Sequence, residues 1–225
     1  DRDEFMRLAA LKQPLVRVRG QWVLLDPAQI EAGLILLGAR GGDLTFEDVL
    51  RLGLDDANPA LGIAVESVQM DGWIKGLLDT LQQPDTLDLL PPPPDLHADL
   101  RPYQQRGYAW MTFLSRYGLG ACLADDMGLG KTVTTIAYLL HQRTTTAEQP
   151  ALVVCPTSVV GNWRRELRRF APDLKLLTHQ GAERVSGEAF VSALDGVDVV
   201  ITSYPLLARD RATLEAVTWS TVILD

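Results

Sequence analysis

The stretch ACLADDMGLGKTVTTIAYL, residues 121–139, joins a short apolar run to an amphipathic helix through a turn that contains glycine. Its GLGKT core, residues 128–132, is typical of a loop that binds phosphate through the N–H groups of a helix N-terminus. The usual pattern G-x-x-x-x-G-K-[ST] would place a first glycine at position 125, where this chain has Asp125. A plain glycine turn is the alternative, but the order of strand, loop, G-K-T and helix favours a phosphate loop.

The residue types of this loop suit a nucleoside triphosphate with Mg²⁺. Lys131 supplies a cation for the outer phosphates and Thr132 a hydroxyl ligand for the metal, while two glycines permit the backbone bends. We therefore predict a nucleoside triphosphate and Mg²⁺ as the ligands of this loop. The predicted nucleotide-binding residues of the loop are Met127, Gly128, Leu129, Gly130, Lys131 and Thr132.

Apolar strands alternate with helical stretches after residue 100. The expected strands are residues 121–124, 151–155, 174–178, 198–203 and 221–225, and the expected helices are residues 131–143, 159–170, 187–194 and 205–216. On the first of these helices, apolar residues recur at spacings of three and four. This alternation predicts an α/β fold, in which a parallel sheet has helices on both faces and ligands bind at the carboxyl ends of the strands.

The first part of the chain differs in charge. Residues 1–100 contain 8 Lys and Arg against 17 Asp and Glu, whereas residues 101–225 contain 13 against 12. Four consecutive prolines, 91–94, favour an extended connector. We therefore expect a small α+β accessory domain at 1–90, a proline-rich linker at 91–99 and a P-loop domain at 100–225. The acidic first domain has no chemical motif, which favours a structural or docking role with a protein partner.

Local patterns predict the elements of the accessory domain. Alternation on both sides of Gly20 predicts a hairpin within residues 15–26. Pro27 and Gly38 bound a predicted helix, and TFED at 45–48 is a capping box before residues 49–54. A further helix is expected at residues 72–81.

Composition excludes other classes of protein. The longest apolar runs fall far short of the roughly 18 residues of a membrane span, so we expect no membrane association. Cys122 and Cys155 lie in apolar runs, which favours buried small side chains over a disulfide or a metal site. The chain begins DRDEF, without Met or a signal segment, which predicts the interior of a longer intracellular protein. The net charge of −8 disfavours nucleic acid, but RRELRR at 164–169 concentrates positive charge locally, as either a solvated face or a DNA contact.

The segment LADDMGLGKT, residues 123–132, resembles motif I of the Swi/Snf-type ATPases, the double-stranded-DNA translocases of helicase superfamily two. In that family the position of the first glycine of the loop is characteristically occupied by an acidic residue, which accounts for Asp125. The resemblance extends in order over residues 100–225. It implies a RecA-like lobe of a motor that uses ATP to move along duplex DNA through backbone contacts, generally without separating the strands.

Two further motifs complete the expected nucleotide site. LRPYQQRGYAWM, residues 100–111, resembles the family's Q motif, which implies that Gln104 binds the adenine edge with help from Arg101 or Tyr103. TVILD, residues 221–225, resembles motif II, which implies that Asp225 holds Mg²⁺ through water and is catalytic together with Lys131. The next glutamate and the second lobe with its arginine finger are not in this sequence. We therefore expect the isolated chain to bind nucleotide weakly and to hydrolyse almost none.

Two motifs imply contacts with the DNA backbone. VVCPTSVVGNW, residues 153–163, resembles motif Ia, and DVVITSYPLL, residues 198–207, resembles the next DNA-contact motif. Plainer roles are an N-cap for Ser158, a core position for Trp163 and ordinary strand ends for the second motif. The residues that the resemblance implies for DNA binding are Thr157, Ser158, Asn162, Thr202 and Ser203.

Other functions remain as alternatives. An RNA-dependent ATPase of the same superfamily is disfavoured by the acidic loop and by the Asn162–Trp163 pair. A nucleotide-sensing or docking module without turnover is a second alternative, and a small-molecule kinase has no reason to carry the downstream motifs. Residues 1–90 resemble the accessory region of bacterial Swi/Snf-type proteins. That resemblance predicts a bacterial source with a cytoplasmic, nucleoid-associated location, or a nuclear location in a eukaryote.

Overall fold

The computed structural model describes residues 15–18, 21–24, 46, 50, 54, 72–145, 149–182 and 184–225. The chain divides into two compact units, Asp1–Leu87 and Asp88–Asp225. Among the described residues, none of the helices combines the length and the apolar character needed to cross a membrane.

The first unit contains the predicted hairpin. Strands β1 (Leu15–Val18) and β2 (Gln21–Leu24) pair antiparallel, and Leu15 lies opposite Leu24. Helix α4 (Gly72–Gln82) agrees with the helix expected at residues 72–81 and is followed by the short η1 (Pro84–Thr86). The helix predicted at 27–38 lies outside the described residues. Of the stretch that begins with the capping box, residues 46, 50 and 54 are described, and they are helical.

A four-stranded parallel sheet organises the second unit, with the strand order β4-β5-β3-β6. The strands are β3 (Ala151–Cys155), β4 (Leu176–Thr178), β5 (Val199–Ser203) and β6 (Thr221–Leu224). Cys155 pairs with Ser203 and Val154 with Leu224, so the carboxyl ends of β3, β5 and β6 lie side by side. The segments that follow these three strands therefore open at one edge of the sheet, as the sequence predicts.

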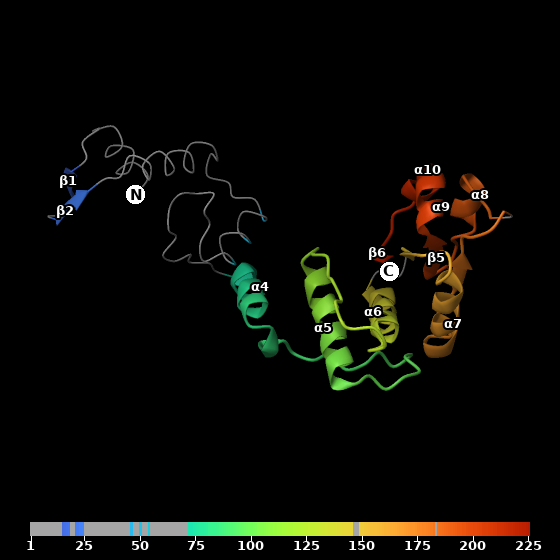
Figure 1. Cartoon of the computed structure of the whole chain (residues 1–225), viewed down its shortest axis with the longest axis horizontal. Helices are drawn as coiled ribbons and strands as arrows, with labels where there is room; N and C mark the ends of the chain where they lie inside the picture. The colour runs from blue at the N-terminus through green and yellow to red at the C-terminus, as the bar shows by residue number, and fades with distance from the viewer. Residues whose placement is uncertain are drawn as a thin grey trace. The chain divides into compact units, whose positions relative to one another are not determined.

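Helices cover both faces of this sheet, which confirms the predicted architecture (Figure 1). On one face, α5 (Pro102–Arg116), α6 (Lys131–Thr145) and α7 (Val160–Phe170) pack against Val153 and Ile201. On the other, α8 (Glu188–Ser192), α9 (Tyr204–Arg209) and α10 (Arg211–Glu215) pack against Val154 and Val200. All residues of β3 and β5 are buried, as expected for strands covered on both sides.

The strand expected at residues 121–124 is not formed. These residues have no assigned strand structure, and both Ala121 and Cys122 are exposed. The prediction that Cys122 is buried is therefore wrong, whereas Cys155 is fully buried. An apolar run becomes a strand only where a neighbour offers ladder hydrogen bonds. Residues 119–123 instead line a hollow opposite β6.

The proline-rich segment packs on the second unit. Leu96 is buried in the core of that unit, and the N–H of His97 donates to the carbonyl of Phe170 at 2.8 Å. The side chain of Gln105 donates to the carbonyl of Leu90 at 2.8 Å. The division between the two units precedes the prolines, at Leu87 and Asp88, and the predicted linker at 91–99 belongs to the second unit.

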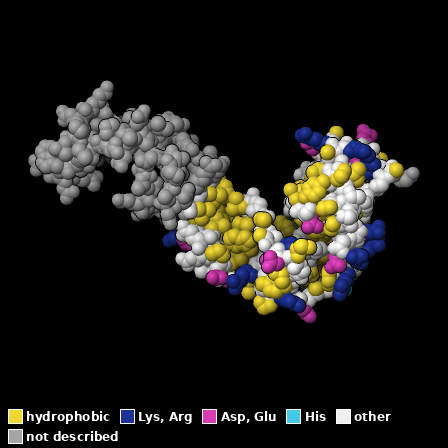
Figure 2. Space-filling model, in the orientation of Figure 1, with side chains coloured by type: hydrophobic (Ala, Val, Ile, Leu, Met, Phe, Trp, Pro, Cys, Tyr) yellow, Lys and Arg dark blue, Asp and Glu magenta, His cyan; other side chains and the backbone are white. Residues whose placement is uncertain are grey.

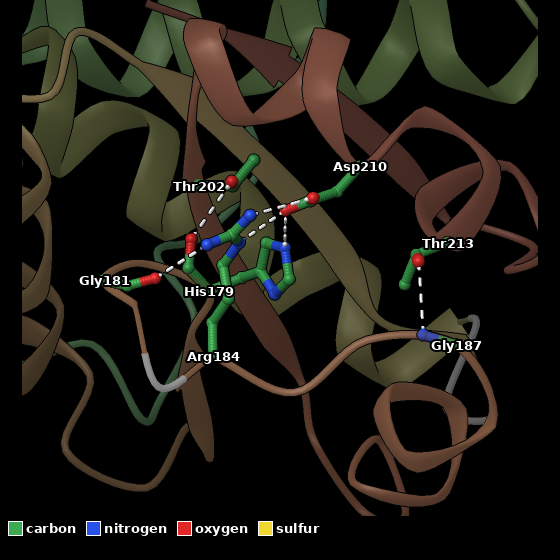
Figure 3. A network of polar contacts seen from close by, with 7 residues as sticks. All are labelled: His179, Gly181, Arg184, Gly187, Thr202, Asp210 and Thr213. Carbon is green, nitrogen blue, oxygen red and sulfur yellow. Dashed lines mark hydrogen bonds and ion pairs between the residues drawn. The ribbon is translucent and has the colours of Figure 1, made fainter.

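A polar clamp divides the helix expected at 205–216 into α9 and α10 (Figure 3). The guanidinium of Arg184 donates to the Asp210 carboxylate through Nε at 2.5 Å and Nη2 at 3.0 Å, and His179 Nε2 lies 2.8 Å from the same carboxylate. The His179 ring is buried edge-on against Phe190. The hydrogen bond from Arg184, more than the one from His179, lowers the pKa of Asp210 from 3.8 to about 2.

This clamp predicts a pH-dependent contribution to stability. A carboxylate with a lowered pKa stabilises the fold above its unfolded pKa of 3.8 and loses this effect as the pH falls through about 2. The shift corresponds to about 2 kcal/mol. Asp210→Asn should therefore lower the unfolding free energy of the 225-residue chain by about 2 kcal/mol at pH 7. The loss should shrink at pH 3, as followed by circular dichroism in denaturant.

The matched control for this variant is Asp195→Asn, which changes an exposed carboxylate of the same unit. It should unfold like the wild type at both pH values. A difference between wild type and Asp210→Asn that stays constant from pH 7 to pH 3 would contradict the role of the ionised carboxylate.

Candidate nucleotide-binding site

The phosphate loop leads into the first turn of α6, which begins at Lys131. Gly128 and Gly130 have φ values of +84° and +81°, in the region that other residues rarely adopt. The ammonium of Lys131 donates to the carbonyls of Asp125 at 2.6 Å and Asp126 at 3.1 Å. The loop therefore places a positive charge at a helix N-terminus, where the macrodipole also favours an anion.

The Q-motif helix packs directly on this loop. The Gln104 amide nitrogen donates to the carbonyl of Leu129 at 2.9 Å, and its oxygen accepts from the N–H of Arg101 at 2.9 Å. The hydroxyl of Tyr103 donates to the same Leu129 carbonyl at 3.0 Å. Gln104 is buried and both ends of its amide bind backbone, so in this arrangement it supports the loop. Sequence reasoning missed this contact, because no local pattern indicates which distant carbonyl a buried amide binds.

The remaining loop residues differ in exposure. Met127 is 95% exposed and Leu129 is 38% exposed, so the tip of the loop faces solvent. Thr132 is half-buried at the start of α6. The side chain of Arg101 is exposed beside the loop that its backbone helps to hold.

A hollow of about 470 Å³ joins the loop to the end of β6. Lys131, Thr132 and Asp225 all line it, although Asp225 is far away in the sequence. The N–H of Asp225 donates to the carbonyl of Val154 at 3.0 Å, which continues the pairing of β3 with β6. The hollow thus contains a cation, a hydroxyl and a carboxylate, and the two oxygen-bearing groups are of the kind that Mg²⁺ prefers.

The carboxylate of Asp225 has a partner that sequence reasoning missed. Trp163, expected to be a core residue, is indeed buried, but its indole N–H donates to Oδ2 of Asp225 at 2.7 Å. The sequence assigned this tryptophan to motif Ia and to the core, and only the fold brings it to the carboxylate. Within the described ranges, His, Cys, Asp and Glu side chains do not gather in groups of three or more that could hold a metal ion.

The residues predicted to contact DNA fall into two groups. Thr157 and Ser158 are exposed in the loop between β3 and α7, and Asn162 is half-buried on α7. Thr202 and Ser203 are buried, and the hydroxyl of Thr202 donates to the carbonyl of His179 at 3.2 Å. Only the first group therefore presents accessible hydroxyls.

The structure of α7 tests the N-cap role considered for Ser158 and shows where the arginines of residues 164–169 lie. The residue at the N-cap of this helix is Val159, so the N-cap role considered for Ser158 is not what the structure shows. Four exposed arginines follow along α7, and Figure 2 shows basic side chains on this side of the unit. They are Arg164, Arg165, Arg168 and Arg169.

Comparison with known proteins identifies the family. Residues 103–225 match the family described as SNF2-related domain, and residues 1–54 match one described as SNF2 Helicase protein. The chain belongs to the SNF2-related family. The Swi/Snf-type resemblance in its motifs is therefore confirmed.

Relatives of this SNF2-related chain include much longer proteins. It is 40% identical, over 99% of its length, to the "Putative ATP-dependent helicase/translocase YwqA" of Bacillus subtilis, of which the match covers 25%. It is 40% identical, over 59% of its length, to the "TATA-binding protein-associated factor mot1" of Aspergillus fumigatus, of which the match covers 8%. The chain thus spans about a quarter of the length of the bacterial relative.

Two solved structures are similar in fold to part of this chain. The Sulfolobus solfataricus SWI2/SNF2 ATPase core in complex with dsDNA has a TM-score of 0.54 and 40% identity, over 61% of this chain and 28% of the other. The core domain from the same organism has a TM-score of 0.55 and 39% identity, over 63% and 28%. These likenesses confirm the predicted RecA-like lobe.

Proposed function

We propose that this chain supplies the first RecA-like lobe and an accessory domain of an ATP-driven motor on double-stranded DNA. The observation that carries the proposal is the common hollow lined by Lys131, Thr132 and Asp225. Asp225 is far from Lys131 and Thr132 in the sequence, and a plain glycine turn would not require the three side chains to converge. The names of the B. subtilis and S. solfataricus proteins support the same reading.

The residues present fit ATP with Mg²⁺. The α6 N-terminus and Lys131 would bind the phosphates, and the two positive-φ glycines keep side chains away from them. The Thr132 hydroxyl and the Asp225 carboxylate would hold the metal, the latter through water. When bound, Mg²⁺ neutralises charge on the phosphates. We assign to Gln104 the support of the loop that its hydrogen bonds show, and we keep an adenine contact by Gln104 and Arg101 as a proposal.

Duplex DNA is the proposed substrate track. Thr157 and Ser158 are suited to donate to backbone phosphates from the carboxyl edge of the sheet. Asn162 lies beside them on α7. Thr202 and Ser203 remain in the proposal as residues at the carboxyl end of β5, although both side chains are buried. A protein partner at the acidic first unit, and action in a bacterial cytoplasm or a eukaryotic nucleus, belong to the same proposal.

The test is the steady-state ATPase rate of the full-length protein that carries this chain, with duplex DNA, single-stranded DNA or RNA, at two salt concentrations. Duplex DNA should raise the rate at least tenfold, a barrier change of about 1.4 kcal/mol. Salt should weaken the stimulation, because phosphate contacts release counterions. A rate indifferent to every polymer would overturn the proposal in favour of a docking module, and preferential stimulation by RNA would favour the RNA-dependent alternative.

A double variant tests the DNA contacts. Thr157→Ala with Ser158→Ala should raise the duplex concentration that gives half-maximal stimulation about threefold to thirtyfold, since two hydroxyl donors are lost. The unstimulated ATPase rate should not change. Ser192→Ala, which removes an exposed hydroxyl from α8 on the opposite face of the sheet, is the matched control. Equal DNA dependence in the two variants would remove motif Ia from the proposed track.

A further inference from the structure

Asp225 is held at three of its atoms by groups from other elements. Its backbone N–H donates to the carbonyl of Val154, and its Oδ2 accepts from Trp163 at 2.7 Å. Its main-chain oxygen accepts from the hydroxyl of Tyr204 at 3.1 Å. The first contact continues the sheet, whereas the other two come from side chains that the proposed nucleotide chemistry does not use.

Trp163 and Tyr204 belong to the two segments that we propose to contact DNA. Trp163 lies in the first turn of α7, directly after the exposed loop of Thr157 and Ser158. Its backbone N–H donates to the carbonyl of Val159. Tyr204 follows Ser203 and opens α9. A shift of either segment therefore moves a hydrogen-bond donor of Asp225.

The contact with Trp163 has the character of a positioning interaction. A neutral indole N–H that donates to a carboxylate makes a charge-assisted bond, which is stronger and more directional than an ordinary one. The ring is 3% exposed, so packing fixes the direction of the donor. Oδ2 is thereby committed to the protein.

We propose that Trp163 is a positioning residue that orients the Asp225 carboxylate for Mg²⁺, and that Trp163 and Tyr204 couple the two proposed DNA-contact segments to this carboxylate. The inference rests on the proposed function and deepens it. Groups that orient a metal-binding carboxylate typically change metal affinity 10-fold to 100-fold when removed. Because coupling between two sites is reciprocal, duplex DNA and Mg²⁺-nucleotide should each strengthen the binding of the other.

The experiment measures binding of a fluorescent, non-hydrolysable ATP analogue to the full-length protein as a function of Mg²⁺ concentration, with and without duplex DNA. Trp163→Phe removes the N–H and keeps an aromatic ring. The matched control is Trp219→Phe, since Trp219 donates its indole N–H to the carbonyl of Leu214 at 2.9 Å, outside the hollow. Tyr204→Phe removes only a hydroxyl from a side chain that is 41% exposed, so it keeps the test valid if Trp163→Phe fails to fold.

The expected result is a rise of about tenfold or more in the half-saturating Mg²⁺ concentration for Trp163→Phe, with metal-free nucleotide binding unchanged. Duplex DNA should lower this concentration in the wild type and in Trp219→Phe, and should lower it less in Trp163→Phe and in Tyr204→Phe. The same Mg²⁺ dependence in Trp163→Phe as in the wild type would overturn the positioning role while leaving the proposed function intact. A wild type whose nucleotide binding ignores Mg²⁺ would overturn both.

Discussion

Replacing Lys131 with Ala is expected to lower the DNA-stimulated ATPase rate of the full-length protein at least about a hundredfold. Removal of one preorganised group that stabilises developing charge typically costs 10² to 10³ in rate. Lys131 is the lysine of the loop, and its ammonium already lies within 3.1 Å of two loop carbonyls. Its loss removes both the charge for the phosphates and two hydrogen bonds that shape the loop.

The effect on binding separates these two roles. Lys131→Arg keeps the positive charge but replaces a compact ammonium by a planar fork, so we expect nucleotide binding to persist and turnover to remain low. Lys175→Ala removes an exposed lysine of the same unit and should leave both quantities unchanged. Circular dichroism of each variant would show whether the fold is retained. A folded Lys131→Ala variant with wild-type turnover would exclude a role for this loop in hydrolysis.

Local patterns in the sequence predict much of the second unit. Apolar runs bounded by turn residues locate β3 and β5, because these strands are buried on both faces and need few polar residues. The run at 221–225 locates β6, whose residues alternate between half-buried and exposed. Residues Ile136, Ala137 and Leu140 recur at helical spacing and are buried as expected. The order of the motifs then gives the family. Motif Ia, the next DNA-contact motif and motif II lie at the carboxyl ends of β3, β5 and β6, which are side by side at one edge of the sheet.

The structure differs from the sequence predictions where contacts between distant residues outweigh local preference. The run at 121–124 is apolar, yet a strand depends on the partner beside it. The helix expected at 205–216 has suitable composition throughout, yet it breaks where the Asp210 carboxylate is bound by Arg184, which is 26 positions away. Composition does not encode such a pairing, so periodicity alone predicts one continuous helix.

In the candidate site, too, the sequence identifies some residues and not others. Its chemical groups, Lys131, Thr132 and Asp225, can be chosen from the sequence because each is required by a motif. The residues that hold these groups in place cannot be chosen in this way, since Gln104 binds a carbonyl 25 positions away and Trp163 binds a carboxylate 62 positions away. In both cases a residue assigned to ligand or core also holds a part of the site in place. Variants of such supports should therefore affect the geometry of the site before they affect its chemistry.

Replacing Gly130 with Ala should make this dependence visible. A Cβ at this position would lie 2.4 Å from the Gln104 amide nitrogen, and the backbone has a φ of +81°. Left-handed backbone costs a residue other than glycine about 1 to 2 kcal/mol, and loss of the Gln104 hydrogen bond to Leu129 costs about 1 kcal/mol more. We expect the unfolding free energy of the 225-residue chain to fall by about 2 to 3 kcal/mol. In the full-length protein, nucleotide affinity should fall at least about tenfold as the loop moves.

Gly128→Ala separates the steric contact from the backbone cost. Gly128 has nearly the same φ, +84°, but a Cβ there would meet nothing within 4 Å. It should therefore lose only the cost of left-handed backbone. The double variant Gly130→Ala with Gln104→Ala removes the obstructing amide, so it should be less destabilised than the sum of its single variants. If denaturant unfolding gave equal losses for Gly128→Ala and Gly130→Ala, the contact between the Q motif and the phosphate loop would carry no stability.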